Sequence, residues 1–189
     1  MSFARPIFPV DPWLTRPPRA TVPAALRPWL VDPHSLTARI RARCTTFGVQ
    51  VLEQRLACPQ VDEAAALGVP VGERAWLREV LLHADGVPVV YARSVLARGR
   101  QGGASRLFHG IGNRPLGAAL FSDPRISRQP LHCARLDRRD ARYHRLAGQV
   151  AGRIDLPASL WARRSVFRLS GRALLVSEIF LPGILDLTS

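Results

Sequence analysis

Residues 76–96 place the strongest constraint on the fold, because two apolar runs flank an Asp-Gly pair. Residues 76–83 and 88–96 are rich in the branched and aromatic side chains that favour β-strands. Asp85-Gly86 between them is typical of a tight two-residue turn. The pattern predicts an antiparallel β-hairpin, which brings particular pairs of side chains together.

With Asp85 and Gly86 at the centre of the turn, Arg78 faces Arg93 across the hairpin. Like charges directly opposite on a sheet repel each other. The pair therefore suggests an anion between the two guanidiniums, such as a carboxylate or phosphate group of a small ligand. Two other interpretations stay open. The arginines could be solvated or paired with structural carboxylates, and a β-bulge would shift the register by one residue and separate them.

A second hairpin is predicted near the end of the chain. Residues 165–169 form one expected strand, Ser170-Gly171 the turn, and residues 172–180 the return strand. The return strand is apolar on both faces, which is typical of a central strand buried on both sides. Glu178 lies within it, and a buried carboxylate is costly unless it is protonated or paired, here with Arg163 or Arg78.

Several helices are expected around these hairpins. Pro23 to Leu30 is predicted to be a short helix, and Ser35 is a plausible N-cap for a helix over 36–43. Asn113 is the expected N-cap of another helix, with Pro115 in its first turn and outward-pointing amides around Leu116 that could bind an anion. A surface helix is expected around 137–151, and residues 1–22 are interpreted as an irregular arm rich in Pro and Arg, with Trp13 and Leu14 docking on the domain.

The chain is strongly basic, with a net charge of +13 over 189 residues, which would ordinarily suggest nucleic acid as a partner. All 27 basic residues are arginine, however, and they are spread along the chain. This indicates a coding bias, so we expect no functional nucleic-acid binding. We find no secretory signal and no apolar run of the roughly 18 residues that a membrane span needs, so a cytoplasmic protein is expected.

Familiar motifs of catalysis and metal binding are absent from the sequence. There is no Walker loop, no GxGxxG and no HExxH, and the five histidines show no metal-ligand spacing. Cys44, Cys58 and Cys133 form no CxxC pair, so neither a zinc site nor a disulfide framework is expected. Cys133 beside His132 is a weak nucleophile-base candidate, because adjacent residues on a strand point apart.

An ordered set of segments resembles a known family. The segments are WLREVLL at 76–82 with ADG at 84–86, ARSV at 92–95, NRPLG at 113–117, RRS at 163–165, RLSG at 168–171 and SEIFLP at 177–182. Together they are similar to the chorismate lyases, which convert chorismate to 4-hydroxybenzoate and pyruvate for ubiquinone biosynthesis. The resemblance implies an α+β domain over 23–189, with a central antiparallel sheet, helices packed against it and flaps over a buried ligand site. Residues 134–158 look like an Arg-rich insertion.

The resemblance also implies roles for individual residues. Arg78 would bind the ring carboxylate, the Leu116 amide would assist, and Glu178 would contact the ring hydroxyl. Arg93 would be the candidate for the enolpyruvyl carboxylate. Leu36 would replace a methionine of the family, a change that conserves volume. The family needs no cofactor and no metal, and we expect a monomer.

Two rival functions remain. The fold also resembles the effector domains of some bacterial transcription regulators, which bind small molecules without catalysis. Residues 1–40 are too short and too rich in proline for the helix-turn-helix that such regulators carry. A basic nucleic-acid-binding protein is the second rival, and the scattered arginines count against it.

Overall fold

The computed structural model describes residues 12–98, 108, 110–112, 114–169 and 171–187. The expected Asn113 cap lies outside these residues. The described elements are, in chain order, α1 (Arg27–Val31), α2 (Leu36–Arg41), β1 (Phe47–Ala57), α3 (Val61–Leu67), β2 (Ala75–Ala84), β3 (Val87–Leu96), α5 (Leu116–Ser122), β4 (Ser127–Arg128), β5 (His132–Asp137), α6 (Ala141–Val150), β6 (Ser159–Leu169), β7 (Arg172–Phe180) and the 3-10 helix η1 (Pro182–Asp186).

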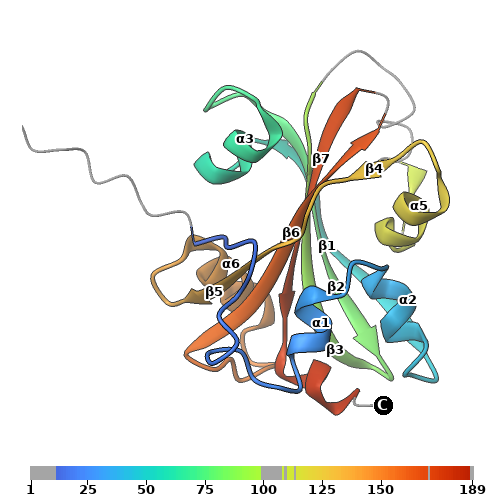
Figure 1. Cartoon of the computed structure of the whole chain (residues 1–189), viewed down its shortest axis with the longest axis vertical. Helices are drawn as coiled ribbons and strands as arrows, with labels where there is room; N and C mark the ends of the chain where they lie inside the picture. The colour runs from blue at the N-terminus through green and yellow to red at the C-terminus, as the bar shows by residue number, and fades with distance from the viewer. Residues whose placement is uncertain (1–11, 99–107, 109, 113, 170, 188–189) are drawn as a thin grey trace, which may run out of the picture.

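The described strands form one seven-stranded antiparallel sheet, as Figure 1 shows. Its strand order is β1-β2-β3-β7-β6-β4, and β5 pairs with β6 beside β4. Both predicted hairpins are present, as β2–β3 and β6–β7, and they lie side by side through the pairing of β3 with β7. The sequence prediction of a central, doubly buried β7 and of an α+β fold is confirmed.

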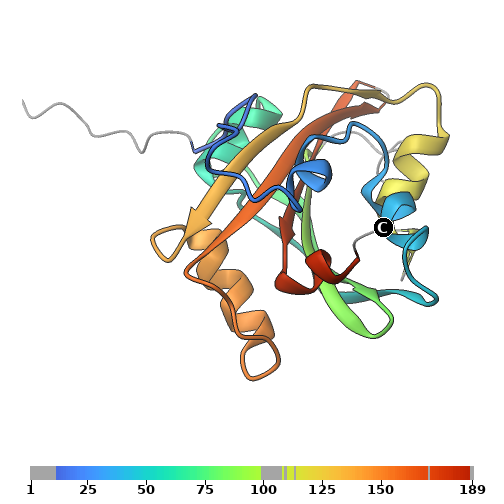
Figure 2. The same cartoon turned by 60° about the horizontal axis from the view of Figure 1, so that its bottom comes forward.

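Helices cover both faces of the sheet (Figures 1 and 2). We call the face that carries Arg78, Val80 and Glu178 the front face, and α1, α2 and α5 lie over it. The opposite, back face is covered by α3 and α6. The strand alternation of period two separates the two faces, because successive side chains of a strand point in opposite directions.

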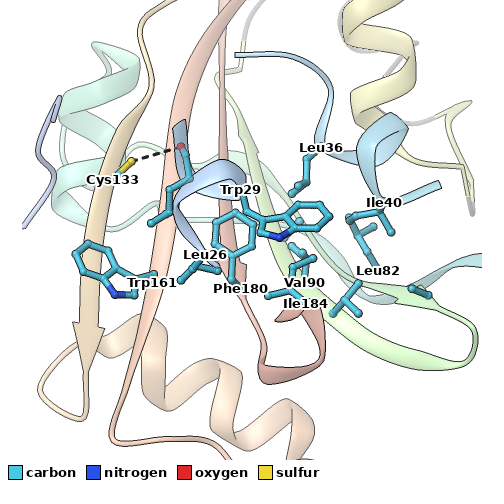
Figure 3. Close-up of a cluster of buried hydrophobic side chains, with 14 of the residues drawn as sticks. Leu26, Trp29, Leu36, Ile40, Leu82, Val90, Cys133, Trp161, Phe180 and Ile184 are labelled. Atoms are coloured by element: carbon cyan, nitrogen blue, oxygen red, sulfur yellow. Dashed lines mark hydrogen bonds between the residues drawn. The ribbon is translucent and has the colours of Figure 1, made fainter. Parts of the chain in front are cut away.

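The lower part of the front face is filled by an apolar cluster, shown in Figure 3. Trp29 of α1 and Leu36 and Ile40 of α2 pack against Leu82 and Phe180 of the sheet. Each of these five side chains is at most 5% exposed. The cluster fixes α1 and α2 above the strands, so it determines where the loop between them, residues 32–35, can lie.

The turn of the first hairpin is as predicted, but the register beyond it is not. Asp85 and Gly86 both have positive φ, at 48° and 82°, as a type I′ turn requires. Pairing then shifts by one residue, because His83 pairs with Pro88 whereas Leu82 pairs with Val90. Val89 is the extra residue of a bulge beside Pro88, which has no amide hydrogen for the ladder.

The shift separates the two arginines that were predicted to face each other. Arg78 pairs with Ser94 and Arg93 pairs with Glu79. Since a one-residue slip moves a side chain to the other face, Arg78 points to the front and Arg93 to the back. The predicted Arg78–Arg93 pair is therefore wrong.

The helix predictions have mixed outcomes. The Ser35 cap is confirmed, because its hydroxyl accepts a hydrogen bond from the Ala38 amide at 3.3 Å. The surface helix is confirmed as α6. Helix α1 begins only at Arg27, and Pro115 occupies the N-cap position of α5 instead of its first turn, so both of these predicted starts are wrong.

The described part of the N-terminal segment is pinned to the back face by one aromatic side chain. Trp13 is buried, and its indole NH donates to Asp62 at 3.1 Å. The guanidiniums of Arg142 and Arg164 lie 5.3 and 4.4 Å from its ring centroid. Leu14 forms a backbone bridge with Cys133 of β5. The predicted docking is confirmed for Trp13, whereas Leu14 contacts the sheet through its backbone and its side chain is 47% exposed. None of the described helices is long and apolar enough to cross a membrane.

Candidate functional site

A cavity lies on the front face, between the sheet and helices α2 and α5. Four of the five residues singled out from the sequence line it: Leu36, Arg78, Leu116 and Glu178. Arg93 does not line it. Apolar side chains such as Val80 and Val176 make up much of the remaining wall. An apolar cavity with a few convergent polar groups is the usual form of a small-molecule site.

Arg78 is the charged group with the least satisfied environment in this cavity. It is 2% exposed, and its Nη2 donates to the carbonyls of Gly112 and Arg114 at 2.8 and 3.3 Å. Its Nη1 is buried without a hydrogen-bond partner among the described residues. Burial lowers the pKa of the Arg78 guanidinium from its ordinary value. A buried cation with an idle donor has a strong tendency to bind an anion.

Glu178 lies in the cavity wall and is held by Arg163. The two residues are directly opposite on β7 and β6, and Arg163 Nε donates to Glu178 Oε2 at 2.6 Å. Arg163 Nη1 also donates to the carbonyls of Trp29 and Asp32, at 2.8 and 2.9 Å. Of the two partners that the sequence offered for Glu178, Arg163 and Arg78, the structure shows Arg163. Within the described chain Glu178 Oε1 accepts no hydrogen bond, which leaves it available to a ligand donor.

Helices α2 and α5 approach each other closely above the cavity. Leu36 and Thr37 of α2 and Leu116 and Gly117 of α5 line it together. A Cβ at Gly117 would lie 3.2 Å from the Thr37 hydroxyl oxygen, closer than an ordinary contact. The absence of a side chain at residue 117 therefore lets the two helices meet as a cover.

Arg128 and Ser165 are two polar residues of the cavity that the sequence reasoning missed. Arg128 Nε donates to the Ser165 hydroxyl at 2.7 Å, and its Nη1 donates to the Pro33 carbonyl. The guanidinium lies 5.2 and 5.3 Å from the ring centroids of Phe121 and Phe167. Arg128 comes from β4, which is only two residues long, so no hydrophobic periodicity could have marked it.

Arg93 belongs to an ion-pair network on the back face. Its Nε and Nη2 donate to the two carboxylate oxygens of Glu63 at 2.7 and 3.0 Å, and its Nη1 pairs with Glu79. Burial lowers the pKa of Arg93, but the Glu63 hydrogen bonds and the Glu63 and Glu79 charges raise it more, so the net shift is upward. The proposed contact between Arg93 and a ligand carboxylate has no support in this arrangement, because its donors are already satisfied.

The adjacent pair His132-Cys133 forms no catalytic dyad. Burial raises the pKa of Cys133 to about 11, so the thiolate is scarce at neutral pH. The thiol donates to the Leu30 carbonyl at 3.6 Å, and it packs in the apolar cluster of Figure 3.

The charged side chains that line the cavity within the described chain are Arg78, Arg128, Arg163 and Glu178. Three positive charges and one negative charge leave a formal excess of two positive charges. Such an excess in an apolar cavity matches a small dianion.

Comparisons with known proteins agree with this chemistry. The family model described as chorismate lyase matches residues 12–188. A relative in Aromatoleum aromaticum, named "Probable chorismate pyruvate-lyase", is 68% identical over 177 residues, which cover 94% of this chain and 95% of the relative. Relatives of the same name in Azoarcus sp. (strain BH72) and Dechloromonas aromatica are 65% and 42% identical over 94% and 91% of this chain, and over 94% and 95% of the relatives.

Solved structures share the fold at low sequence identity. PhnF from Mycobacterium smegmatis superposes with a TM-score of 0.53 at 21% identity, covering 84% of this chain and 67% of that one. The C-terminal domain of the histidine utilization repressor from Pseudomonas syringae gives 0.52 at 13% identity, covering 73% and 93%. These likenesses concern architecture alone. The family model and the sequence relatives carry the assignment: this chain belongs to the chorismate lyase family, and it is a lyase.

Proposed function

We propose that this enzyme converts chorismate to 4-hydroxybenzoate and pyruvate in the front-face cavity. Chorismate carries two carboxylates, and the cavity has an excess of two positive charges. The observation that carries the proposal is the idle Nη1 of the buried Arg78, which lies ready for a carboxylate. We further infer that the product enters ubiquinone biosynthesis, as its first committed step, and that the protein acts in the cytoplasm.

In this proposal Arg78 binds the ring carboxylate. Its guanidinium is oriented by the Gly112 and Arg114 carbonyls, so its remaining donor has a fixed direction. Leu36 and Leu116 enclose the ring from α2 and α5. Arginine suits this task because its planar fork fixes the orientation of a carboxylate better than a lysine could.

Glu178 is proposed to contact the ring hydroxyl through its Oε1. The reaction breaks the ether C–O bond, and the ring carbon that bears the hydroxyl loses its proton as the ring becomes aromatic. Glu178 could accept that proton, or the methylene of the departing enolpyruvyl group could accept it in a cyclic shift. Because aromatisation drives the reaction, the protein needs mainly to hold the reactive conformer and to stabilise negative charge on the departing group.

The proposed product keeps the carboxylate and the hydroxyl, and it therefore keeps the contacts to Arg78 and Glu178. With α2 and α5 closed over the cavity, we expect slow release of 4-hydroxybenzoate to limit turnover.

The test is to incubate the purified protein with chorismate and to follow both products. Pyruvate is measured by coupling to lactate dehydrogenase and 4-hydroxybenzoate by its ultraviolet absorbance. Equal amounts of both are expected. Binding of 4-hydroxybenzoate without release of pyruvate would instead support the alternative, a non-catalytic ligand-binding domain of the same fold.

A further inference from the structure

Arg78 and Arg128 lie toward opposite ends of one row of residues that runs across the front face. Strand pairing places Arg78 opposite Ser94, Ser94 opposite Val176 and Val176 opposite Ser165. The row ends at β6, where Arg128 of β4 donates to the Ser165 hydroxyl. Three strand spacings separate β2 from β6, roughly 14 Å between backbones at the usual spacing. Two long arginine side chains that reach inward over this width leave room between them for a ring.

Glu178 lies beside the middle of this row. It is two residues along β7 from Val176 and therefore on the same face, and it pairs with Arg163 on β6. A ring that lies over Val176 would place its hydroxyl near Glu178, with one arginine beyond each edge of the ring.

Arg128 has the features of a built anion site. Burial, and then the nearby Arg163 charge, lower the pKa of its guanidinium, and the Glu178 and Asp32 charges offset this only in part. Nε and Nη1 are fixed by Ser165 and Pro33, and the rings of Phe121 and Phe167 flank the guanidinium. Its Nη2 donates no hydrogen bond to any of the described residues. A cation that is held rigidly, with one donor in reserve, is preorganised for a ligand.

Arg163 is a poorer candidate for the same task. Its charge is already balanced by the Glu178 carboxylate, and its Nη1 donates to the carbonyls of Trp29 and Asp32, whereas the hydrogen-bond partners of Arg128 are an uncharged hydroxyl and an uncharged carbonyl. Arg163 therefore orients Glu178, and the second positive charge in excess is that of Arg128.

We propose that Arg128, supported by Ser165, binds the carboxylate of the enolpyruvyl group of chorismate. This inference rests on the proposed function, and it transfers to Arg128 the role that the family resemblance implied for Arg93. The two carboxylates of the substrate would then lie at the two ends of the row, and the departing enolpyruvate would leave with its negative charge against Arg128.

The test uses the fact that 4-hydroxybenzoate lacks the enolpyruvyl carboxylate. In the Arg128→Gln variant, kcat/KM for chorismate should fall roughly 10- to 100-fold, the usual cost of losing a charge-assisted hydrogen bond. The dissociation constant of 4-hydroxybenzoate, measured by calorimetry, should stay within about twofold of the wild-type value, because that ligand makes no contact with Arg128. Arg78→Gln should instead weaken both ligands.

Arg135→Gln is the matched control. Arg135 is also a strand arginine whose Nε donates to a serine of β6, Ser159 at 2.8 Å, but it is exposed and does not line the cavity. Both ligands should bind to this variant as they bind to the wild type. Circular dichroism and thermal melting establish that each variant is folded. If Arg128→Gln fails to fold, Arg128→Lys replaces it: loss of the planar fork should still lower kcat/KM for chorismate, by a smaller factor, and leave 4-hydroxybenzoate binding unchanged.

Two results would overturn the inference. Equal weakening of chorismate and 4-hydroxybenzoate in the Arg128 variant would assign Arg128 a structural role, and unchanged values for both would remove it from the site. If the wild-type protein binds 4-hydroxybenzoate but releases no pyruvate, the proposed function fails. The role of Arg128 is then decided by the same pair of binding constants, because chorismate binding can be titrated without turnover.

Discussion

The buried and half-buried arginines on the two faces of the sheet have different partners. On the back face, Arg93 and Arg145 pair with Glu63 and Glu79, and Arg142 and Arg164 pair with Asp62 and Asp140. On the front face, the cavity holds Arg78, Arg128 and Arg163 with Glu178 alone. Charges balance on the back face and leave an excess of two on the front.

This difference separates structural arginines from those available to a ligand. A buried ion pair with complete partners holds elements together, as Arg93 does between α3, β2 and β3. A buried guanidinium with an idle donor contributes little to folding, because its desolvation is not offset by an anion of the protein. Arg78 is such a residue, and its cost is offset only when an anion binds.

The largest effect is expected on the back face, in stability. Arg93→Met leaves Glu63 buried without its arginine partner and leaves Glu79 with Arg145 alone, which should lower the free energy of unfolding by about 3–5 kcal/mol. Urea denaturation measures this loss. Adding Glu63→Gln and Glu79→Gln to the same variant should recover much of it, because the two buried carboxylates are then replaced by uncharged amides.

The same Arg93→Met variant tests whether Arg93 has a structural role alone. Assayed at a temperature where it is folded, it should release pyruvate from chorismate at close to the wild-type rate. A folded variant of normal stability that had lost turnover would return Arg93 to the ligand site.

For Arg78 we expect the opposite: a large loss of activity with a small change in stability. Arg78→Ala should lower kcat/KM for chorismate by about 2–4 kcal/mol in transition-state terms, or on the order of 30- to 1000-fold. Its free energy of unfolding should change far less than that of Arg93→Met, because Arg78 pairs with no carboxylate in the described chain. Near-normal pyruvate release by this variant would remove Arg78 from the proposed site.

These two arginines also show how far the sequence could predict the site. Alternation of period two is enough to place Arg78 on one face with Val80 and Leu82, and Glu178 on one face with Val176 and Phe180, because strand geometry fixes which side chains share a face. The register across the hairpin depended on a single extra residue at Val89. Pro88 marked the place where the ladder could be interrupted, but the resulting pairing is set by the fit of β3 against β2 and β7.

No local sequence pattern could have identified Arg128 as a site residue. Its strand is two residues long, and its contacts join it to Pro33 and Ser165, which are 95 and 37 positions away in the chain. Contacts of such range arise from the packing of whole elements, which a local pattern does not encode. The same holds for the Trp29 and Asp32 carbonyls that orient Arg163.

On the front face, the Glu178→Gln variant separates the two proposed roles of Glu178. Glu178→Gln keeps a hydrogen-bond acceptor for the ring hydroxyl but has no basic carboxylate. A hydrogen-bonding role predicts a loss of roughly tenfold in kcat, the scale of one weakened hydrogen bond. An obligatory base predicts a loss of about 10²- to 10⁴-fold. Single-turnover kinetics with chorismate distinguishes the two, because it excludes product release.

The smallest effect concerns the loop that orients Arg163, and it depends on pH. Burial raises the pKa of Asp32, but hydrogen bonds from the His34 amide, the His34 ring and Arg39 outweigh it and bring the pKa to about 2, below the ordinary 3.8. Since the folded-state pKa is the lower one, the stabilisation is present above about pH 4 and is lost as the pH falls toward 2. Partial exposure and screening limit it to about 1 kcal/mol. In urea denaturation at pH 7, Asp32→Asn should therefore have a free energy of unfolding up to about 1 kcal/mol below that of the wild type. This difference between the two proteins should become smaller between pH 4 and 3. A difference that stays constant over this range would show that Asp32 stabilises the loop through its shape and not through its charge.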